Sequence, residues 1–127
     1  MNSLRILIAD DDRDTVLTPS MLLTDEGHDV RGVYSGRHVM GCVIDFDPHV
    51  IVLDINLPAR SGWGVARSIR ERCGKERPLL IGISGEYKHG ADQLLSQSLG
   101  FNHYLLKPYE PTALIGLIDS LGYSGPA

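Results

Sequence analysis

The sequence predicts an α/β protein with a doubly wound sheet of five parallel strands. Short apolar runs alternate five times with segments of helical length along the chain. Most of these runs are rich in valine, isoleucine and leucine, which is typical of strands buried on both faces of a parallel sheet. Glycine and proline stand where the intervening helices would end or begin. We therefore expect a (βα)5 domain with right-handed crossovers.

The elements follow in a regular order. The expected strands are residues Leu4–Ala9, Asp29–Val33, Val50–Leu53, Leu79–Ile83 and His103–Leu106. The last two helices each show one apolar stripe, formed by Ala91, Leu94, Leu95 and Leu99 and by Leu114, Leu117, Ile118 and Leu121. Helix ends are expected at Gly27, Gly100 and Gly122, and Pro111 fits the first turn of the last helix.

The first helical segment, roughly residues 13–26, contains an internal proline, Pro19. Such a proline removes a hydrogen bond and crowds the preceding turn, so the helix is either kinked there or begins at Pro19. We favour one kinked helix, because a loop before Pro19 would leave Val16 and Leu17 poorly buried. Asp12 is then expected to cap its N-terminus.

Length and charge limit the function classes. The 127 residues suit a single domain, here residues 1–127, and the net charge of -4 argues against direct nucleic-acid binding. The sequence has neither a run long enough to span a membrane nor a signal-peptide pattern, so a cytoplasmic protein is expected. Cys42 and Cys73 lack zinc-site spacing and are expected to be reduced thiols. All five histidines are expected in surface or loop positions.

Polar residues stand at the carboxyl ends of four of the five expected strands. Asp10 and Asp11 follow the first, Asp54 ends the third, Ser84 ends the fourth, and Lys107 follows the fifth. The carboxyl ends of parallel strands meet at one edge of a sheet, so these groups should share one crevice. Three neighbouring carboxylates call for a cation, and oxygen ligands suit Mg²⁺.

A magnesium ion among carboxylates also favours a phosphoryl group, because the ion can bridge carboxylate and phosphate oxygens. Lys107 would supply a positive charge and Ser84 a hydroxyl donor to such a group. Asp54 then has the features of a nucleophile that forms an acyl phosphate.

At this point the chain resembles the receiver domains of two-component response regulators. The matching features are Asp10-Asp11 after an apolar run, Asp54 within Val-Leu-Asp-Ile-Asn-Leu-Pro, Ser84 after Gly82-Ile83, Tyr104, and Lys107-Pro108. They span nearly the whole chain in the family's order. The resemblance implies a flavodoxin-like fold, similar to the chemotaxis regulators, with strand order 2-1-3-4-5.

The resemblance also implies roles for the site residues. Asp54 would accept a phosphoryl group from a histidine kinase or a phosphotransfer protein. Asp11 would bind Mg²⁺ directly, Asp10 would assist, often through water, and Asp54 and the backbone carbonyl of Asn56 would complete the ligand set. The domain would catalyse only its own phosphoryl transfer and dephosphorylation, and would not otherwise be an enzyme.

Switching is implied by the same resemblance. Lys107 would contact the phosphoryl group, and the Lys107-Pro108 peptide bond would be cis. Ser84 would shift toward the phosphate, and Tyr104 would rotate inward behind it. These movements would change the face formed by the fourth helix, the fifth strand and the fifth helix. That face would bind a downstream output domain or partner protein, and the domain itself would be a monomer or weak dimer.

Two other functions compete with this one. A receiver-like interaction module that is never phosphorylated would tend to lose an acidic residue or the lysine, and this chain keeps them all. An aspartyl-phosphate phosphohydrolase of the haloacid dehalogenase type would want an acid two residues after its nucleophile. The chain has Asn56 at that place and lacks the size and the cap of such an enzyme.

Overall fold

The structure, a computed structural model, describes residues 3–57, 62–74, 77–84, 100–107 and 109–120. One parallel sheet has the order β2-β1-β3-β4-β5, as the resemblance implies. Its strands are β1 (Arg5–Ala9), β2 (Asp29–Val33), β3 (Val50–Asp54), β4 (Leu79–Ser84) and β5 (His103–Leu106). The described helices are α1 (Arg13–Asp25), α2 (Gly36–Phe46), α3 (Gly62–Cys73) and α5 (Pro111–Ser120). The helix predicted around residues 91–99 lies outside the described residues, as do Pro108, Leu121 and Gly122.

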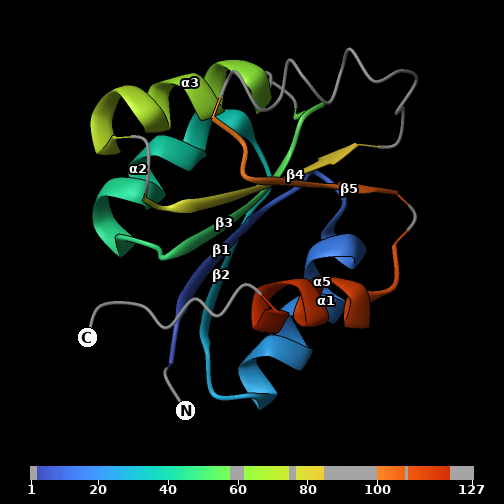
Figure 1. Cartoon of the computed structure of the whole chain (residues 1–127). Helices are drawn as coiled ribbons and strands as arrows, with labels where there is room; N and C mark the ends of the chain where they lie inside the picture. Colours follow the sequence, from blue (N-terminus) through green and yellow to red (C-terminus); the bar gives the residue numbers. More distant parts are fainter. Residues whose placement is uncertain (1–2, 58–61, 75–76, 85–99, 108, 121–127) are drawn as a thin grey trace.

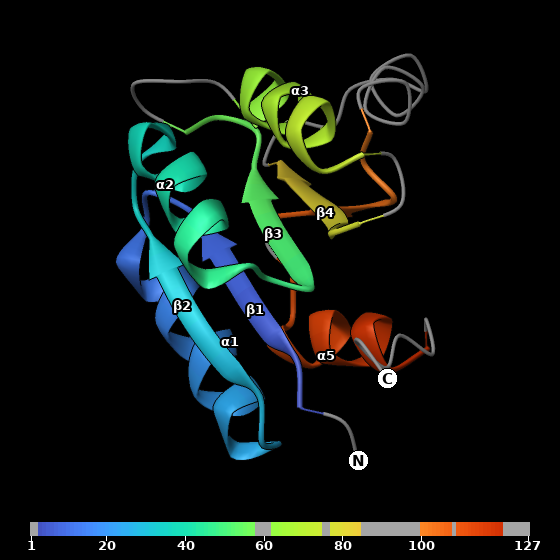
Figure 2. The same ribbon diagram turned by 90° about the vertical axis from the view of Figure 1, so that its left-hand side faces the viewer.

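The helices form two layers on the sheet. Helices α1 and α5 lie side by side against one face, and α2 and α3 cover the other (Figure 1 and Figure 2). Strand β1 shows how the alternation of side chains supplies both layers. Ile6 and Ile8 pack with α1 and α5, whereas Leu7 and Ala9 pack with α2 and α3. These four side chains are almost fully buried, and each large aliphatic one contributes about 1.5–3 kcal/mol to stability.

Burial on both faces holds for the central strands and not for the edge strands. Every residue of β3 is buried. In β2 only Val33 is buried, and β5 contains no buried residue. Each edge strand has a neighbouring strand on one side only, so its side chains lie closer to solvent. The expectation that most strands are buried on both faces therefore holds for β1, β3 and β4 and does not extend to β2 and β5.

The first helix is continuous through its proline. Helix α1 runs from Arg13 to Asp25 with Pro19 buried inside it, which confirms one helix in place of a late start. Asp12 caps it, because its Oδ1 accepts hydrogen bonds from the backbone N–H groups of Asp14 and Thr15. The side chain of Val16 is buried, whereas Leu17 is 56% exposed.

Two histidines depart from the expected surface positions. His28 and His49 are buried, at the starts of β2 and β3. Their Nδ1 atoms accept hydrogen bonds from the backbone N–H groups of Leu4, at 3.1 Å, and Arg5, at 2.8 Å. Each imidazole thus acts as an acceptor that fixes the start of β1. Sequence reasoning missed this because a buried imidazole acceptor has no spacing pattern of its own.

Acid is expected to weaken the hydrogen bond from the N–H of Arg5 to Nδ1 of His49. Burial lowers the pKa of His49 below 6.5, the nearby Arg5 adds to this effect, Arg77 acts in the same direction, and Asp47 opposes it. The unfolded state therefore binds the proton first, and the free energy of unfolding should fall as pH drops below about 6.5, by at most about 1.4 kcal/mol per pH unit for one histidine. Urea unfolding across this range should show a steeper loss in the wild type than in His49→Asn.

Asparagine at position 49 can still accept a hydrogen bond but cannot titrate. His38 is exposed, so His38→Asn serves as the matched control and should keep the wild-type slope. If the free energy of unfolding depends on pH equally in His49→Asn and in the wild type, protonation of His49 does not weaken the fold.

Candidate functional site

The polar crevice is built where the central strands end. Backbone hydrogen bonds extend the sheet by one step beyond three strands, from the N–H of Asp10 to Val33, of Ile55 to Ile83 and of Lys107 to Ser84. These bonds fix the residues that follow the apolar runs. One carboxylate oxygen from each of Asp10, Asp11 and Asp54 lies within 4.8 Å of the others. The structure thus brings the three predicted acids together.

Two of the acids are buried and held by the backbone. Asp10 is 2% exposed and Asp54 is 4% exposed, whereas Asp11 lies at the surface. Oδ1 of Asp10 accepts a hydrogen bond from the N–H of Asp12, and Oδ1 of Asp54 accepts one from the N–H of Asn56. Each carboxylate is therefore oriented by one oxygen, and its second oxygen faces the crevice.

Lys107 lies between these two second oxygens. Its Nζ is 2.7 Å from Oδ2 of Asp10 and 3.0 Å from Oδ2 of Asp54. Only the approach to Asp54 has the geometry of a hydrogen bond. The ammonium thus pairs with both acids while the Lys107 side chain remains 25% exposed.

The titration of the site reflects burial and mutual charge. Burial raises the pKa of Asp10, the charge of Asp54 adds to this effect, and contacts with Lys107 and the N–H of Asp12 only partly oppose it. For Lys107, burial alone would lower the pKa. The close contacts with Asp10 and Asp54 and the charges of these two carboxylates outweigh burial, so the pKa of Lys107 is raised and the side chain stays a cation.

The donor set fits a hard divalent cation. All three clustered groups are carboxylates, and one ammonium compensates only one of their three charges. Oδ2 of Asp10 is buried, and the partner that the structure gives it among the described residues is the Lys107 ammonium at 2.7 Å, so a second lone pair would be left for a cation. Oxygen donors with surplus negative charge are better ligands for Mg²⁺ than for softer metals.

The other predicted residues lie around this cluster. Ser84 is buried at the end of β4, and its carbonyl is bonded to the N–H of Lys107. Tyr104 is half-buried on β5 and packs against the core beneath α2 and α3. Asn56, two residues after Asp54, is exposed. The structure brings Asn56 and Ser84 to the site and places Tyr104 one step behind it.

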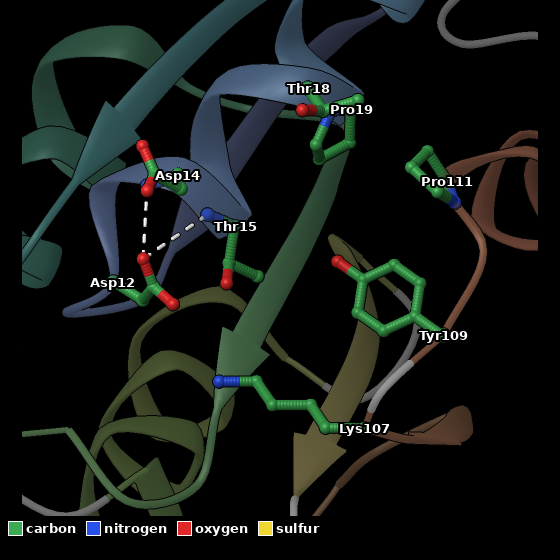
Figure 3. Close-up of a pocket in the computed structure, with 8 residues that line it drawn as sticks. All are labelled: Asp12, Asp14, Thr15, Thr18, Pro19, Lys107, Tyr109 and Pro111. Carbon is green, nitrogen blue, oxygen red and sulfur yellow. Dashed lines mark hydrogen bonds between the residues drawn. The ribbon is translucent and has the colours of Figure 1, made fainter.

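A cavity of about 520 Å³ opens beside Lys107, between α1 and the start of α5. Tyr109 forms part of its wall, and its phenol points toward α1 (Figure 3). The hydroxyl is buried without a hydrogen-bond partner among the described residues. Burial and the charge of Asp10 raise the pKa of Tyr109 to about 12, so the phenol stays neutral. Sequence reasoning missed Tyr109, and its only signal was its place two residues after Lys107.

This fold and this acidic site with its lysine define a receiver domain of the response regulator class. The family model of the response regulator receiver domain matches residues 6–119, so the chain belongs to that family and to two-component signalling. As the sequence predicts, it is a receiver domain and not a conventional enzyme, which removes the phosphohydrolase alternative.

Among curated proteins, the aerobic respiration control protein ArcA of Escherichia coli K12 is 30% identical over 114 residues. The match covers 90% of this chain and 46% of ArcA, so the chain spans about half the length of that relative. No described helix is long and apolar enough to cross a membrane.

Solved structures share the fold at lower identity. The chemotaxis response regulator CheY4 of Vibrio cholerae superposes with a TM-score of 0.86 at 20% identity, covering 94% of this chain and 99% of CheY4. The BeF3-activated receiver domain of Klebsiella pneumoniae RstA gives a TM-score of 0.80 at 21% identity, covering 91% of this chain and 96% of that chain. These likenesses establish the flavodoxin-like fold.

Proposed function

We propose that the domain is a phosphoacceptor, with Asp54 as the residue that receives the phosphoryl group. The single observation that carries this proposal is the position of Lys107 between Asp54 and Asp10, with Asp11 completing the acidic cluster. A carboxylate beside an ammonium and a cation-binding group of acids is suited to attack an electrophilic phosphorus.

The donor is a phosphohistidine of a histidine kinase or a phosphotransfer protein, the partner class that receiver-family membership implies. A carboxylate oxygen of Asp54 attacks phosphorus, an O–P bond forms, and the P–N bond to the donor imidazole breaks with its electron pair going to nitrogen. The product is an acyl phosphate on Asp54 and a free imidazole on the donor. Hydrolysis of the acyl phosphate returns the resting carboxylate.

Each residue has a separate part in this reaction. Asp10, Asp11, Asp54 and the backbone carbonyl of Asn56 would hold Mg²⁺, which reduces the repulsion between carboxylate and phosphoryl oxygens. Lys107 can move from its carboxylate partners to a phosphoryl oxygen, because its ammonium already lies 3.0 Å from Asp54. Ser84, buried at the end of the neighbouring strand β4, would donate its hydroxyl to another phosphoryl oxygen.

Output depends on the face that carries β5 and α5. Ser84 and Tyr104 lie on neighbouring strands, and Leu106 on β5 is 46% exposed at the edge of the sheet. Movement of Ser84 toward the phosphate and of Tyr104 behind it would bias this face between two arrangements. A downstream partner that prefers one arrangement would then respond to phosphorylation.

Phosphorylation of Asp54 can be tested by intact mass after incubation with acetyl phosphate and Mg²⁺. The wild type should gain one phosphoryl group, and Asp54→Asn should gain none while keeping the fold, because the amide is nearly isosteric but not nucleophilic. Omitting Mg²⁺ should also abolish the gain. Persistent labelling of Asp54→Asn at another residue would contradict the assignment.

The interaction module that is never phosphorylated predicts a different outcome. It would show neither a mass gain nor Mg²⁺ binding. Mg²⁺ binding without a mass gain would indicate slow loading or fast hydrolysis, and a beryllofluoride mimic would then replace acetyl phosphate.

A further inference from the structure

Because Gly82, in the middle of β4, has no side chain, the rings next to it can lie close to the backbone of β4. We call the space where its side chain would be the gap. Gly82 is paired in register with Tyr104 on β5, so the two residues face the same side of the sheet. Leu80 and Ser84 flank Gly82 on that side, because residues two apart on a strand share a face. The gap therefore lies between the core and the strand end that carries Ser84.

Aromatic rings occupy this gap. A Cβ added at Gly82 would lie 2.9 and 3.0 Å from Cδ1 and Cε1 of Phe101, and 3.3 Å from Cδ2 of Tyr104. Contacts under 3.0 Å require the neighbours to move, and Phe101 is buried. Only glycine at this position leaves both rings where they lie.

The segment that carries Phe101 is tied to two elements. Arg70 on α3 donates hydrogen bonds from Nε to the carbonyl of Gly100, at 2.9 Å, and from Nη2 to Oδ1 of Asn102, at 2.8 Å. Asn102 also exchanges hydrogen bonds with the backbone of Leu80 on β4. The backbone around Phe101 is thus fixed, which leaves ring movements as the way to accommodate a change at Tyr104.

Trp63 extends the aromatic group to the start of α3. Its ring meets that of Phe101 edge to face, with centroids 5.9 Å apart at 90°. Tyr104 packs against the same core cluster. A displacement of Tyr104 therefore changes the surroundings of Phe101, and through Phe101 those of Trp63.

We propose that Gly82 is a positioning residue for Tyr104, and that Phe101 links Tyr104 to Trp63, so that the start of α3 senses where the tyrosine lies. The part that concerns signalling rests on the proposed function, in which Tyr104 moves on phosphorylation. The part that concerns Gly82 is independent of it, because the gap is present in the resting domain.

Trp63 is the only tryptophan of the chain, so tryptophan emission reports this position alone. In the wild type, emission should change on phosphorylation with acetyl phosphate and Mg²⁺. Tyr104→Ala should lose most of that change while still gaining the phosphoryl group by mass. Tyr104→Phe keeps the ring and should retain the change, which separates the aromatic contact from the hydroxyl.

Gly82→Ala tests the gap in the resting state. Its emission should already differ from the wild type before phosphorylation, and its further change on phosphorylation should be reduced. Gly41→Ala on α2 is the matched control, because a Cβ there meets nothing within 4 Å, and its emission should be that of the wild type.

The outcomes separate the two proposals. A full emission change in phosphorylated Tyr104→Ala would overturn the link, and wild-type emission of folded Gly82→Ala in both states would overturn the positioning role. If Gly82→Ala does not fold, the Tyr104 pair still decides the link. Absence of phosphorylation in the wild type would defeat the proposed function alone, and resting emission that is shifted in Gly82→Ala and Tyr104→Ala but not in Tyr104→Phe would still support the aromatic contact.

Discussion

Gly62→Ala should lower the free energy of unfolding by about 3 kcal/mol, the upper range for a clash in a packed interior. A Cβ at Gly62 would lie 2.5 Å from Cα of Ile55 and 2.6 Å from the carbonyl oxygen of Asp54. Both neighbours are backbone atoms at the end of β3, so no side-chain rotation can relieve the contact. Urea unfolding of the variant and the wild type measures the loss.

The same clash should disturb the proposed phosphorylation site at Asp54. Gly62 donates its N–H to the carbonyl of Ile55 at 2.7 Å, which holds the start of α3 against the residues that follow β3. Moving α3 away would shift Asp54, so the folded fraction of Gly62→Ala should load phosphoryl groups more slowly. Gly41→Ala, with open space at its Cβ, should instead gain about 0.5–1 kcal/mol as an alanine within a helix. Equal urea midpoints for Gly62→Ala and the wild type would refute the close approach.

Lys107→Met should destabilise the metal-free domain by about 2–3 kcal/mol at neutral pH. Removing one partner of a buried ion pair leaves an uncompensated charge that costs about 3–5 kcal/mol, and partial exposure of Lys107 reduces the effect. Here two buried carboxylates, Asp10 and Asp54, would face each other. Methionine retains the apolar stem, so urea unfolding should report mainly the lost charge.

The deficit of Lys107→Met should depend on pH and on Mg²⁺. The pKa of Asp10 is already raised above 3.8 by burial, and without the ammonium it should rise further. A raised acid pKa gives stability that is present at low pH and lost as pH rises through the folded-state pKa, so the deficit should grow from acid toward neutral pH. Mg²⁺ should restore more stability to this variant than to the wild type, because the ion replaces the missing positive charge.

The change in partner affinity on phosphorylation tests whether Lys107 does more than stabilise the fold. Lys107→Met should still bind Mg²⁺ and yet fail to change partner affinity after phosphorylation, because no ammonium follows the phosphoryl group. Arg67→Met removes a surface charge paired with Glu71 on α3 and should alter neither property. Normal partner switching by Lys107→Met would count against the coupling role of the lysine.

The sequence by itself determined the sheet and the place of the acidic cluster. Apolar runs that end in Asp10, Asp54, Ser84 and Lys107 could satisfy burial only as parallel strands with their polar ends at one edge. The strand bounds came out within one residue for every run, and His103–Leu106 matches β5 in full. Strand ends are predictable because the change from apolar to polar residues is local in the sequence.

Tertiary structure alone decided which residues approach one another closely. The sequence does not predict the burial of Leu17 or of His49. The apolar side chain of Leu17 is exposed to solvent, whereas the imidazole of His49 is buried and accepts a hydrogen bond from a backbone N–H. Gly62 and Gly82 look like ordinary glycines until the backbone of β3 and the ring of Phe101 are seen against them. Contacts of this kind join residues far apart in the chain, and no residue pattern within one segment encodes the distance between two segments.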